Sequence, residues 1–438
     1  MKRRRRAIIL LAVLLWGGVS FFVGEYLAHG RSWVMHSDNP HIFRGKNLNI
    51  GKIYDGNGII LADLSRGTYA AGADLRAACV HWTGDLAGRV YAAVSAQFAA
   101  QMAAYDLWSG IQGWDSEMML SISAEVQTAA WEAMRGRRGV VAIYNYRTGQ
   151  ILCALSAPGF DPIEAEVVEG AYVNRFLQGS YVPGSIFKTV TAAAVLKKKP
   201  QLQYEKFQCT GAVQYSDGKV TCESVHGWLD LNGALTQSCN CVFAQIAQRL
   251  GRQSLADFVA DSGVLQPVVI DGVESRGGHG EFANVGAGGF AWASIGQGED
   301  QINPAGFLAF MGAVANGGQG VRPYLVESIS RQGRMRYQAS TRLEEPILSP
   351  SEAQTLQKML RSCVQNKYGE EGFAGLTVCA KSGTAQVGKE QPNAMFAGFV
   401  TDEKYPLAFF VAVEEGGYGA KTCIPILSRV LQVCKEQM

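Results

Sequence analysis

One uncharged segment near the amino terminus constrains this chain most. Residues 7–24 read AIILLAVLLWGGVSFFVG and carry no charge, and as a helix rising about 1.5 Å per residue they nearly cross a hydrocarbon core. The basic run KRRRR at residues 2–6 precedes them, so the positive-inside rule predicts a cytoplasmic amino terminus. We expect one transmembrane helix within residues 1–30 and an extracellular remainder. A cleaved signal peptide is the alternative, but the apolar stretch exceeds the usual h-region of roughly 7 to 15 residues.

The composition indicates an ordinary folded protein beyond that segment. The 438 residues suggest two or three domains at about 150 residues each. Hydrophobic residues make up 47% and charged residues 18%, and the formal net charge is +2. The basic run at residues 2–6 exceeds this net charge, so the rest of the chain is slightly acidic. These values argue against disorder and against a nucleic-acid partner.

Residues 31–119 form a small expected module next to the membrane. The string IYDGNGIILADL predicts two strands joined by a turn at residues 55–58. The Ala-rich segment at residues 92–108 has aromatic residues at helical spacing, which predicts a packed helix.

Residues 120–438 carry the pattern of a larger domain. Apolar runs flank residues 145–149 and again TDEKYP at residues 401–406, which predicts two β-hairpins. A helix is expected after Gly184, ending at the KKKP of residues 197–200, and another at residues 424–433. Helices mixed with a mainly antiparallel sheet predict an α+β domain.

Ser185 and Lys188 are the first candidates for chemistry, because they stand at i and i+3 of PGSIFK and share one helix face. A serine hydroxyl attacks well only when a base takes its proton, and a lysine is such a base when burial or a neighbouring cation lowers its pKa. The SxxK pattern recurs at residues 216–219 in a turn-like SDGK, which we interpret as a solvated loop. The pair alone is therefore weak evidence.

The order of three motifs is more specific than any one of them. Ser185 and Lys188 are followed by Ser238 and Asn240 in SxN, and then by Lys381 in the only K[ST]G string. This set resembles the active-site motifs of penicillin-binding proteins and serine β-lactamases. The strings YVPGSIFKT and CAKSGTAQ resemble those of class B, the monofunctional transpeptidases. The resemblance covers roughly residues 120–438 and implies an antiparallel sheet flanked by helices.

The resemblance implies a role for each motif residue. Ser185 would attack the penultimate D-Ala carbonyl of a peptidoglycan stem peptide, and Lys188 would accept the hydroxyl proton. Ser238 and Lys381 would relay that proton to the leaving amine. Asn240 would hold the acyl chain's amide and orient Lys188.

Ser382, Gly383 and Thr384 would form the substrate-binding strand. The hydroxyl groups of Ser382 and Thr384 would receive the substrate carboxylate, and the backbone NH groups of Ser185 and Thr384 would bind the oxyanion. β-Lactams would acylate Ser185. No cofactor is implied.

The resemblance also implies a partner, a membrane glycan polymerase of the SEDS (shape, elongation, division and sporulation) type. The module before residue 120 is smaller than the pedestal of many class B proteins, and it is too short for the glycosyltransferase domain of class A. A β-lactamase or D,D-carboxypeptidase is one alternative function, although the ExxLN string of class A β-lactamases is absent between residues 240 and 381. A non-catalytic scaffold that binds β-lactams or muropeptides is another.

The cysteines and histidines predict no metal site. All ten cysteines follow the apolar segment, no CxxC occurs, and the spacings do not match a zinc finger. Cys209 and Cys222 flank a turn-like segment and could form a disulfide, or remain buried thiols. The six histidines form no HExxH or paired set, so none is a candidate ligand.

Overall fold

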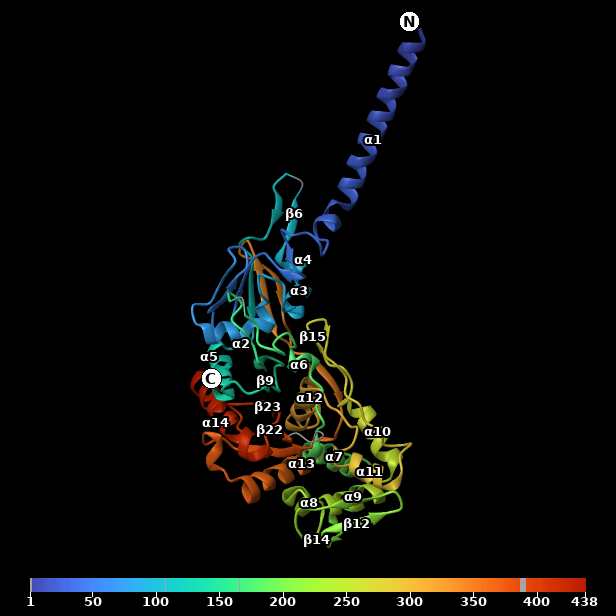
Figure 1. The fold of residues 1–438 in the computed structure, drawn as a ribbon, viewed down its shortest axis with the longest axis vertical. Helices are drawn as coiled ribbons and strands as arrows, with labels where there is room; N and C mark the ends of the chain where they lie inside the picture. The colour runs from blue at the N-terminus through green and yellow to red at the C-terminus, as the bar shows by residue number, and fades with distance from the viewer. Residues whose placement is uncertain (1, 107, 165, 387–390) are drawn as a thin grey trace.

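The computed structural model describes residues 2–106, 108–164, 166–386 and 391–438. Helix α1 (Lys2–Val34) projects from one end of the molecule (Figure 1). Its apolar side chains are exposed, and an 18-residue window within it has a mean hydropathy of 2.4, so it is long and apolar enough to cross a membrane. The predicted helix is confirmed, and it extends ten residues beyond the apolar segment.

A mixed sheet lies next to α1 and draws on two distant parts of the chain. Its order is β19-β18-β8-β3-β4-β5. Strands β3 (Lys52–Tyr54) and β4 (Ile60–Asp63) form the predicted hairpin. Strands β18 (Val326–Arg331) and β19 (Arg334–Gln338) come from the second predicted domain. The two parts therefore share a sheet, and the boundary at residues 119 and 120 stays a prediction.

The prediction of one packed helix over residues 92–108 is wrong. The segment forms two short helices, α3 (Ala93–Gln97) and α4 (Ala99–Met102), and then strand β6 (Ala104–Asp106). At Phe98 the backbone leaves the helical range, with ψ of 17°. β6 pairs with β7 (Gly110–Gln112), so residues 104–106 form a strand, while Ala93, Ala96, Ala99 and Ala100 before them stay helical.

The central sheet has five antiparallel strands in the order β10-β9-β23-β22-β21. The two predicted hairpins are β9 (Gly139–Asn145) with β10 (Ile151–Ala157), and β22 (Asn393–Val400) with β23 (Leu407–Val413). Strand β21 (Val378–Ala385) closes one edge beside β22. The α+β prediction is confirmed.

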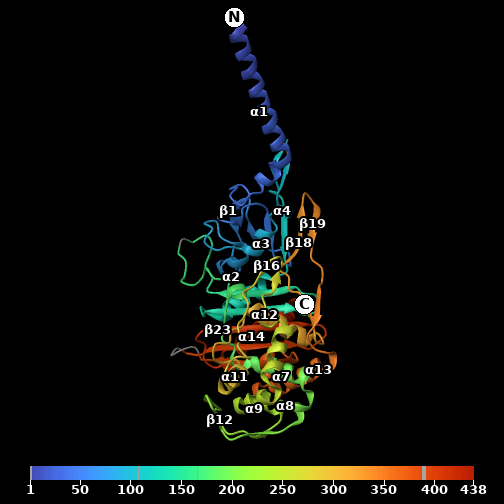
Figure 2. The same ribbon diagram turned by 90° about the vertical axis from the view of Figure 1, so that its right-hand side faces the viewer.

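Helices cover both faces of this sheet. Successive side chains of a strand point to opposite faces, and the apolar runs of these strands therefore place apolar side chains on both faces. On β23, Phe409 and Val411 pack with helices α5 (Ala124–Met134) and α14 (Gly419–Gln437). Phe410 and Ala412 belong to the cluster on the other face, where α12 (Pro304–Ala315) lies. Figure 2 shows the sheet between the membrane-proximal part and α8 and α9.

The end opposite α1 consists of helices α8 (Leu231–Gln237) and α9 (Asn240–Leu250) with four short strands (Figure 1). Strand β11 (Phe207–Cys209) pairs with β14 (Gly227–Leu229), and β12 (Ala212–Tyr215) pairs with β13 (Gly218–Thr221). The remaining elements are β1 (Phe43–Arg44), β2 (Asn47–Leu48), β5 (Thr68–Tyr69), α2 (Ala73–Thr83), β8 (Glu117–Leu120), α6 (Arg175–Gln178), η1 (Gly184–Phe187), α7 (Lys188–Lys198), η2 (Pro200–Tyr204), α10 (Arg252–Ser262), β15 (Val269–Ile270), β16 (Val273–Glu274), α11 (Ala287–Ala293), β17 (Gln319–Val321), β20 (Leu343–Pro346), α13 (Pro350–Cys363), η3 (Val364–Tyr368) and η4 (Glu371–Phe373).

Candidate active site

Ser185 and Lys188 meet at the start of the central helix α7. The single 3-10 turn η1 carries Ser185 and leads directly into α7, whose first residue is Lys188. Lys188 is fully buried, and its Nζ lies 2.9 Å from Ser185 Oγ. The spacing thus places an amine within hydrogen-bond reach of the hydroxyl, as a serine nucleophile requires.

The partners of Lys188 define which way its lone pair points. Nζ donates to Ser238 O at 2.8 Å and to Asn240 Oδ1 at 2.6 Å. Both acceptors are carbonyl oxygens, which cannot donate, so they take two N–H groups of a neutral amine. The lone pair of that amine is then left for a hydroxyl proton, and Ser185 Oγ at 2.9 Å is nearer than Ser238 Oγ at 3.2 Å.

The surroundings of Lys188 also favour its neutral form. Burial and, second, the positive charge of Lys381 together lower the pKa of Lys188 to about 7. The aromatic ring of Phe243 lies 5.8 Å from Nζ. An amine with a pKa near neutrality is suited to general-base catalysis.

A tight turn between α8 and α9 delivers Ser238 and Asn240. Ser238 ends α8 in the left-handed conformation, with φ of +55°. Asn240 is the first residue of α9, and its Nδ2 donates to Thr221 O at 2.9 Å. That bond leaves Oδ1 facing Lys188. The turn therefore fixes both side chains against the nucleophile helix.

Lys381 reaches the same serine from the edge strand β21. Its side chain is buried, and Nζ donates to Ser238 Oγ at 3.1 Å and to Tyr368 Oη at 3.3 Å. Lys188 Nζ lies 3.2 Å from the same Ser238 Oγ. Ser238 Oγ thus bridges the two lysines, and a proton can pass between them through one hydroxyl.

The β21 backbone lies directly against the nucleophile turn. A Cβ on Gly383 would lie 2.7 Å from Pro183 O, and one on Gly184 would lie 2.8 Å from Thr384 O. Gly184 also has a φ of +56°, which strains any other residue. Glycine at both positions allows the strand to approach Ser185 closely.

Ser382 and Thr384 are half-buried on this strand. Ser382 Oγ lies 2.9 Å from Tyr368 Oη. Thr384 Oγ1 accepts a hydrogen bond from the backbone NH of Gly419 at 3.2 Å. The predicted roles of these hydroxyl groups towards a substrate carboxylate stay predictions.

Tyr368 is the residue that the motif analysis missed. It ends the π-turn η3, and its hydroxyl accepts from the backbone NH of Ser382 at 3.0 Å as well as from Lys381. No motif marks it, because its role depends on η3 folding back against β21. Its contacts fix the orientation of the lysine on this strand.

The structure also revises the expectation that no histidine is a candidate ligand. Cys209, Cys222, His226 and Cys239 each offer one ligand atom, and these four atoms all lie within 4.8 Å of one another. No disulfide joins any of the ten cysteines, all of which lie in the described part of the chain.

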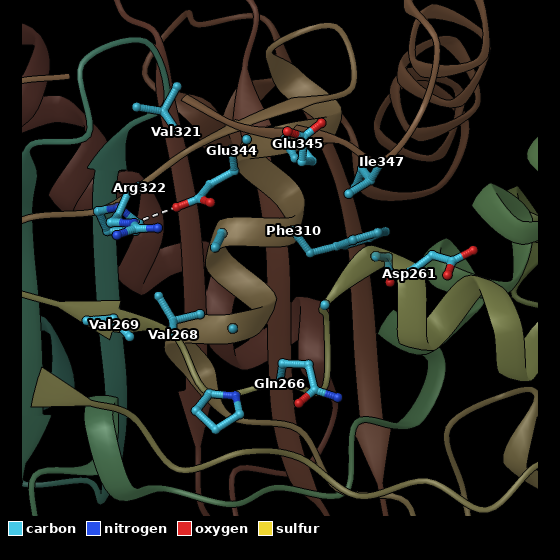
Figure 3. A pocket seen from close by; sticks show the side chains of 18 residues that line it. Asp261, Gln266, Val268, Val269, Phe310, Val321, Arg322, Glu344, Glu345 and Ile347 are labelled. Atoms are coloured by element: carbon cyan, nitrogen blue, oxygen red, sulfur yellow. Dashed lines mark hydrogen bonds and ion pairs between the residues drawn. The ribbon is translucent and has the colours of Figure 1, made fainter. Parts of the chain in front are cut away.

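A separate cavity of about 320 Å³ lies at the carboxyl end of α10 and beside α12. Asp261, Phe310 and Arg322 line it, and Arg322 forms an ion pair with Glu344 at its rim (Figure 3). None of the motif residues lines this cavity. The catalytic geometry therefore lies elsewhere, along β21 and α7.

A serine beside a buried lysine, with a second lysine that shares one hydroxyl with the first, is the arrangement expected of a serine acyl-transfer site. The chain belongs to the family described by the "Penicillin binding protein transpeptidase domain" model, which matches residues 139–432. That range contains every motif residue.

Named relatives and solved structures agree with this assignment. The chain is 28% identical over 350 residues to the peptidoglycan D,D-transpeptidase PbpA of Mycolicibacterium smegmatis, covering 71% of this chain and 70% of the relative. It is 28% identical to stage V sporulation protein D of Bacillus subtilis, covering 72% of this chain and 53% of that protein. Penicillin-binding protein A of M. tuberculosis, solved as a ceftriaxone acyl-enzyme complex, shares the fold with a TM-score of 0.76 at 21% identity, covering 89% and 98% of the two chains.

Proposed function

We propose that this chain is a serine D,D-transpeptidase that cross-links peptidoglycan stem peptides through an acyl-enzyme on Ser185, and that β-lactams inhibit it by acylating the same residue. The observation that carries this proposal is the 2.9 Å separation between Ser185 Oγ and the buried amine of Lys188. Family membership and the names of the relatives support the substrate class.

Acylation would follow from the hydrogen bonds around Lys188. Its lone pair takes the hydroxyl proton while Ser185 Oγ attacks the penultimate D-Ala carbonyl. The backbone NH groups of Ser185 and Thr384 stabilise the oxyanion. When the intermediate collapses, the proton passes through Ser238 Oγ to the leaving amine, and Lys381 holds that hydroxyl in place. The terminal D-Ala departs and an ester on Ser185 remains.

The second half of the reaction runs the same proton path in reverse. The amine of a second stem peptide attacks the ester, and Lys188 returns the proton to Ser185 Oγ. Asn240 holds the acyl chain's amide while its Oδ1 orients Lys188. Ser382, Gly383 and Thr384 form the strand along which the substrate binds, and the half-buried hydroxyl groups of Ser382 and Thr384 receive its carboxylate.

We further propose that α1 anchors the protein in the cytoplasmic membrane as a single pass, with its basic amino terminus in the cytoplasm. The run at residues 2–6 supports this orientation. The catalytic domain is then extracellular, where stem peptides are found. The family model that matches this chain is a transpeptidase model, and we propose a SEDS-type membrane polymerase as the partner that supplies the glycan.

Intact-mass spectrometry of the full chain with benzylpenicillin over time tests the acyl-transfer proposal. We expect a stoichiometric adduct that maps to Ser185 and persists for many minutes. Ser185→Ala should lose the adduct and fail to restore growth to a depleted strain. The matched control is Ser180→Ala, five residues earlier, which should keep both.

Two results would contradict the proposal. An adduct that turns over within seconds would indicate a β-lactamase or a D,D-carboxypeptidase that uses water. Restoration of growth by Ser185→Ala as good as that by wild type would indicate a non-catalytic scaffold.

A further inference from the structure

Four potential metal ligands converge beside the catalytic turn from four separate elements. Cys209 ends β11, Cys222 directly follows β13, His226 directly precedes β14, and Cys239 caps the start of α9. Cys209 and Cys239 are buried, and Cys222 and His226 are half-buried. These elements form the end of the molecule opposite α1 (Figure 1).

Two distances within this group match tetrahedral zinc coordination. With Zn–S of about 2.3 Å and Zn–N of about 2.0–2.1 Å, two sulfurs of a tetrahedral site lie about 3.8 Å apart, and a sulfur and a nitrogen lie about 3.6 Å apart. Cys222 Sγ and Cys239 Sγ are 3.6 Å apart. Cys209 Sγ and His226 Nδ1 are also 3.6 Å apart. The two atoms of each pair lie within 4.8 Å of the two atoms of the other pair.

Neighbouring groups supply the hydrogen bonds that such ligands need. The backbone NH of Cys241 donates to Cys222 Sγ at 3.2 Å, and that of Val242 donates to Cys239 Sγ at 3.4 Å. Both NH groups belong to the first turn of α9, where the helix dipole favours negative charge. The second ring nitrogen of His226, Nε2, lies 3.2 Å from Ser224 Oγ. A partner on the non-ligating nitrogen is typical of metal-bound histidine.

We propose that Cys209, Cys222, His226 and Cys239 form a structural zinc site. Three thiolates and one imidazole suit Zn²⁺ and exclude Mg²⁺ and Ca²⁺, which prefer oxygen ligands. Binding releases one proton from each of the three thiols and leaves a complex with one net negative charge. Four protein ligands close the coordination sphere, so the ion has a structural role and leaves the acyl-transfer chemistry to Ser185.

The site has a direct consequence for catalysis, because Cys239 stands between Ser238 and Asn240 in the chain. The side chains of both residues contact Lys188. The ion ties their turn to β11, β13 and β14, in addition to the hydrogen bond from Asn240 Nδ2 to Thr221 O at the end of β13. Cys239 is thus a positioning residue for the SxN turn.

Metal analysis of the full chain, purified in detergent under reducing conditions without chelator, tests the site directly. We expect one zinc ion per chain. Replacement by Co²⁺ should give the visible bands of four-coordinate cobalt together with thiolate-to-cobalt charge transfer in the near ultraviolet. Ser185→Ala should bind zinc as well as wild type does, so this test is independent of the proposed transpeptidase reaction.

Cys209→Ser tests the ligand assignment at a ligand that lies on β11, outside the turn that carries Ser238 and Asn240. It should bind zinc at least tenfold more weakly than wild type. Cys241→Ser is the matched control, because Cys241 adjoins the same turn, is buried and offers its sulfur to Val220 O instead. It should retain one zinc ion. Loss of zinc from Cys241→Ser together with retention by Cys209→Ser would overturn the assignment.

Removing zinc from the wild-type chain with a chelator avoids variants that fail to fold. We expect a lower thermal midpoint and at least a tenfold lower acylation rate constant at saturating benzylpenicillin. Adding Zn²⁺ back should restore both, and Mg²⁺ should restore neither. A reduced wild-type chain that carries no zinc and gives no tetrahedral cobalt spectrum would overturn the proposal. A disulfide between Cys222 and Cys239 in the natively isolated protein, found by peptide mapping, would do the same.

Discussion

The acylation of Ser185 should depend on pH through Lys188. An ordinary lysine with a pKa near 10.4 is neutral in about one molecule in 2,500 at pH 7. Lys188 has a pKa lowered to about 7, first by burial and second by the charge of Lys381. About half of the molecules then carry the neutral base at pH 7. We expect the second-order rate constant for acylation by a fluorescent penicillin to rise with pH around 7 and to level off above about 8.5.

Lys381→Met separates the two causes of that low pKa. The substitution keeps the length of the side chain but removes the cation, so the pKa of Lys188 should rise. The rising part, or limb, of the plot of acylation rate constant against pH should then move to higher pH by about 1 unit. Lys197→Met is the control, because Lys197 lies at the far end of α7 and pairs with Glu352 instead. Stopped-flow acylation at constant ionic strength measures the limb for all three proteins.

Two outcomes would refute this reasoning. A wild-type limb near pH 10 would mean that Lys188 behaves as an ordinary exposed lysine. A limb that stays at the same pH in Lys381→Met, with only the plateau lowered, would mean that Lys381 acts on the substrate alone and leaves the base unchanged.

Three further substitutions test the surroundings of the site. Folding lowers the pKa of Lys188, so between about pH 7 and 10.5 the wild-type unfolded chain binds more protons than the folded chain. Wild-type stability therefore rises with pH in that window, and Lys188→Met should make stability less dependent on pH. Urea unfolding at pH 7 and pH 9 measures the difference, and an equal gain in both proteins would contradict it. Tyr368→Phe removes the hydroxyl that accepts from Lys381 and should slow acylation roughly tenfold, while the thermal midpoint measured by circular dichroism stays nearly unchanged. Gly383→Ala places a methyl group 2.7 Å from Pro183 O and should cost about 1–3 kcal/mol of folding free energy in urea titrations; a neutral result would show that β21 can move away.

Local patterns predicted the parts of this molecule that local physics determines. Residues 145–149 and 401–406 connect apolar runs that pair as hairpins in the central sheet. The i, i+3 spacing placed Lys188 on the same helical face as Ser185, and the structure puts the two side chains 2.9 Å apart. In each case the partners lie within a few residues of one another, so a short window of sequence contains the whole interaction.

Sequence patterns did not predict the contacts between segments that lie far apart in the chain. The strands β18 and β19 join the membrane-proximal sheet although they lie about two hundred residues away from its other members. Tyr368 reaches Lys381 only because η3 folds back on β21. His226 lies four positions from Cys222 and still gave no motif, because the remaining two ligands come from β11 and α9. Spacing along the chain carries no record of such meetings.

The conformation of Ser238 shows why the catalytic turn needs support beyond its own sequence. A non-glycine residue in the left-handed region costs roughly 1–2 kcal/mol, and Ser238 stands there with φ of +55°. Its backbone carbonyl and its hydroxyl both contact Lys188, so relaxing the strain would withdraw two hydrogen bonds from the base. The neighbouring Cys239 caps α9 through its sulfur, and a bound zinc ion would connect that sulfur to the ends of β11, β13 and β14. Cys239 thus helps to hold the strained conformation of Ser238. The geometry around Lys188 therefore depends on the four proposed zinc ligands, of which Cys239 is one.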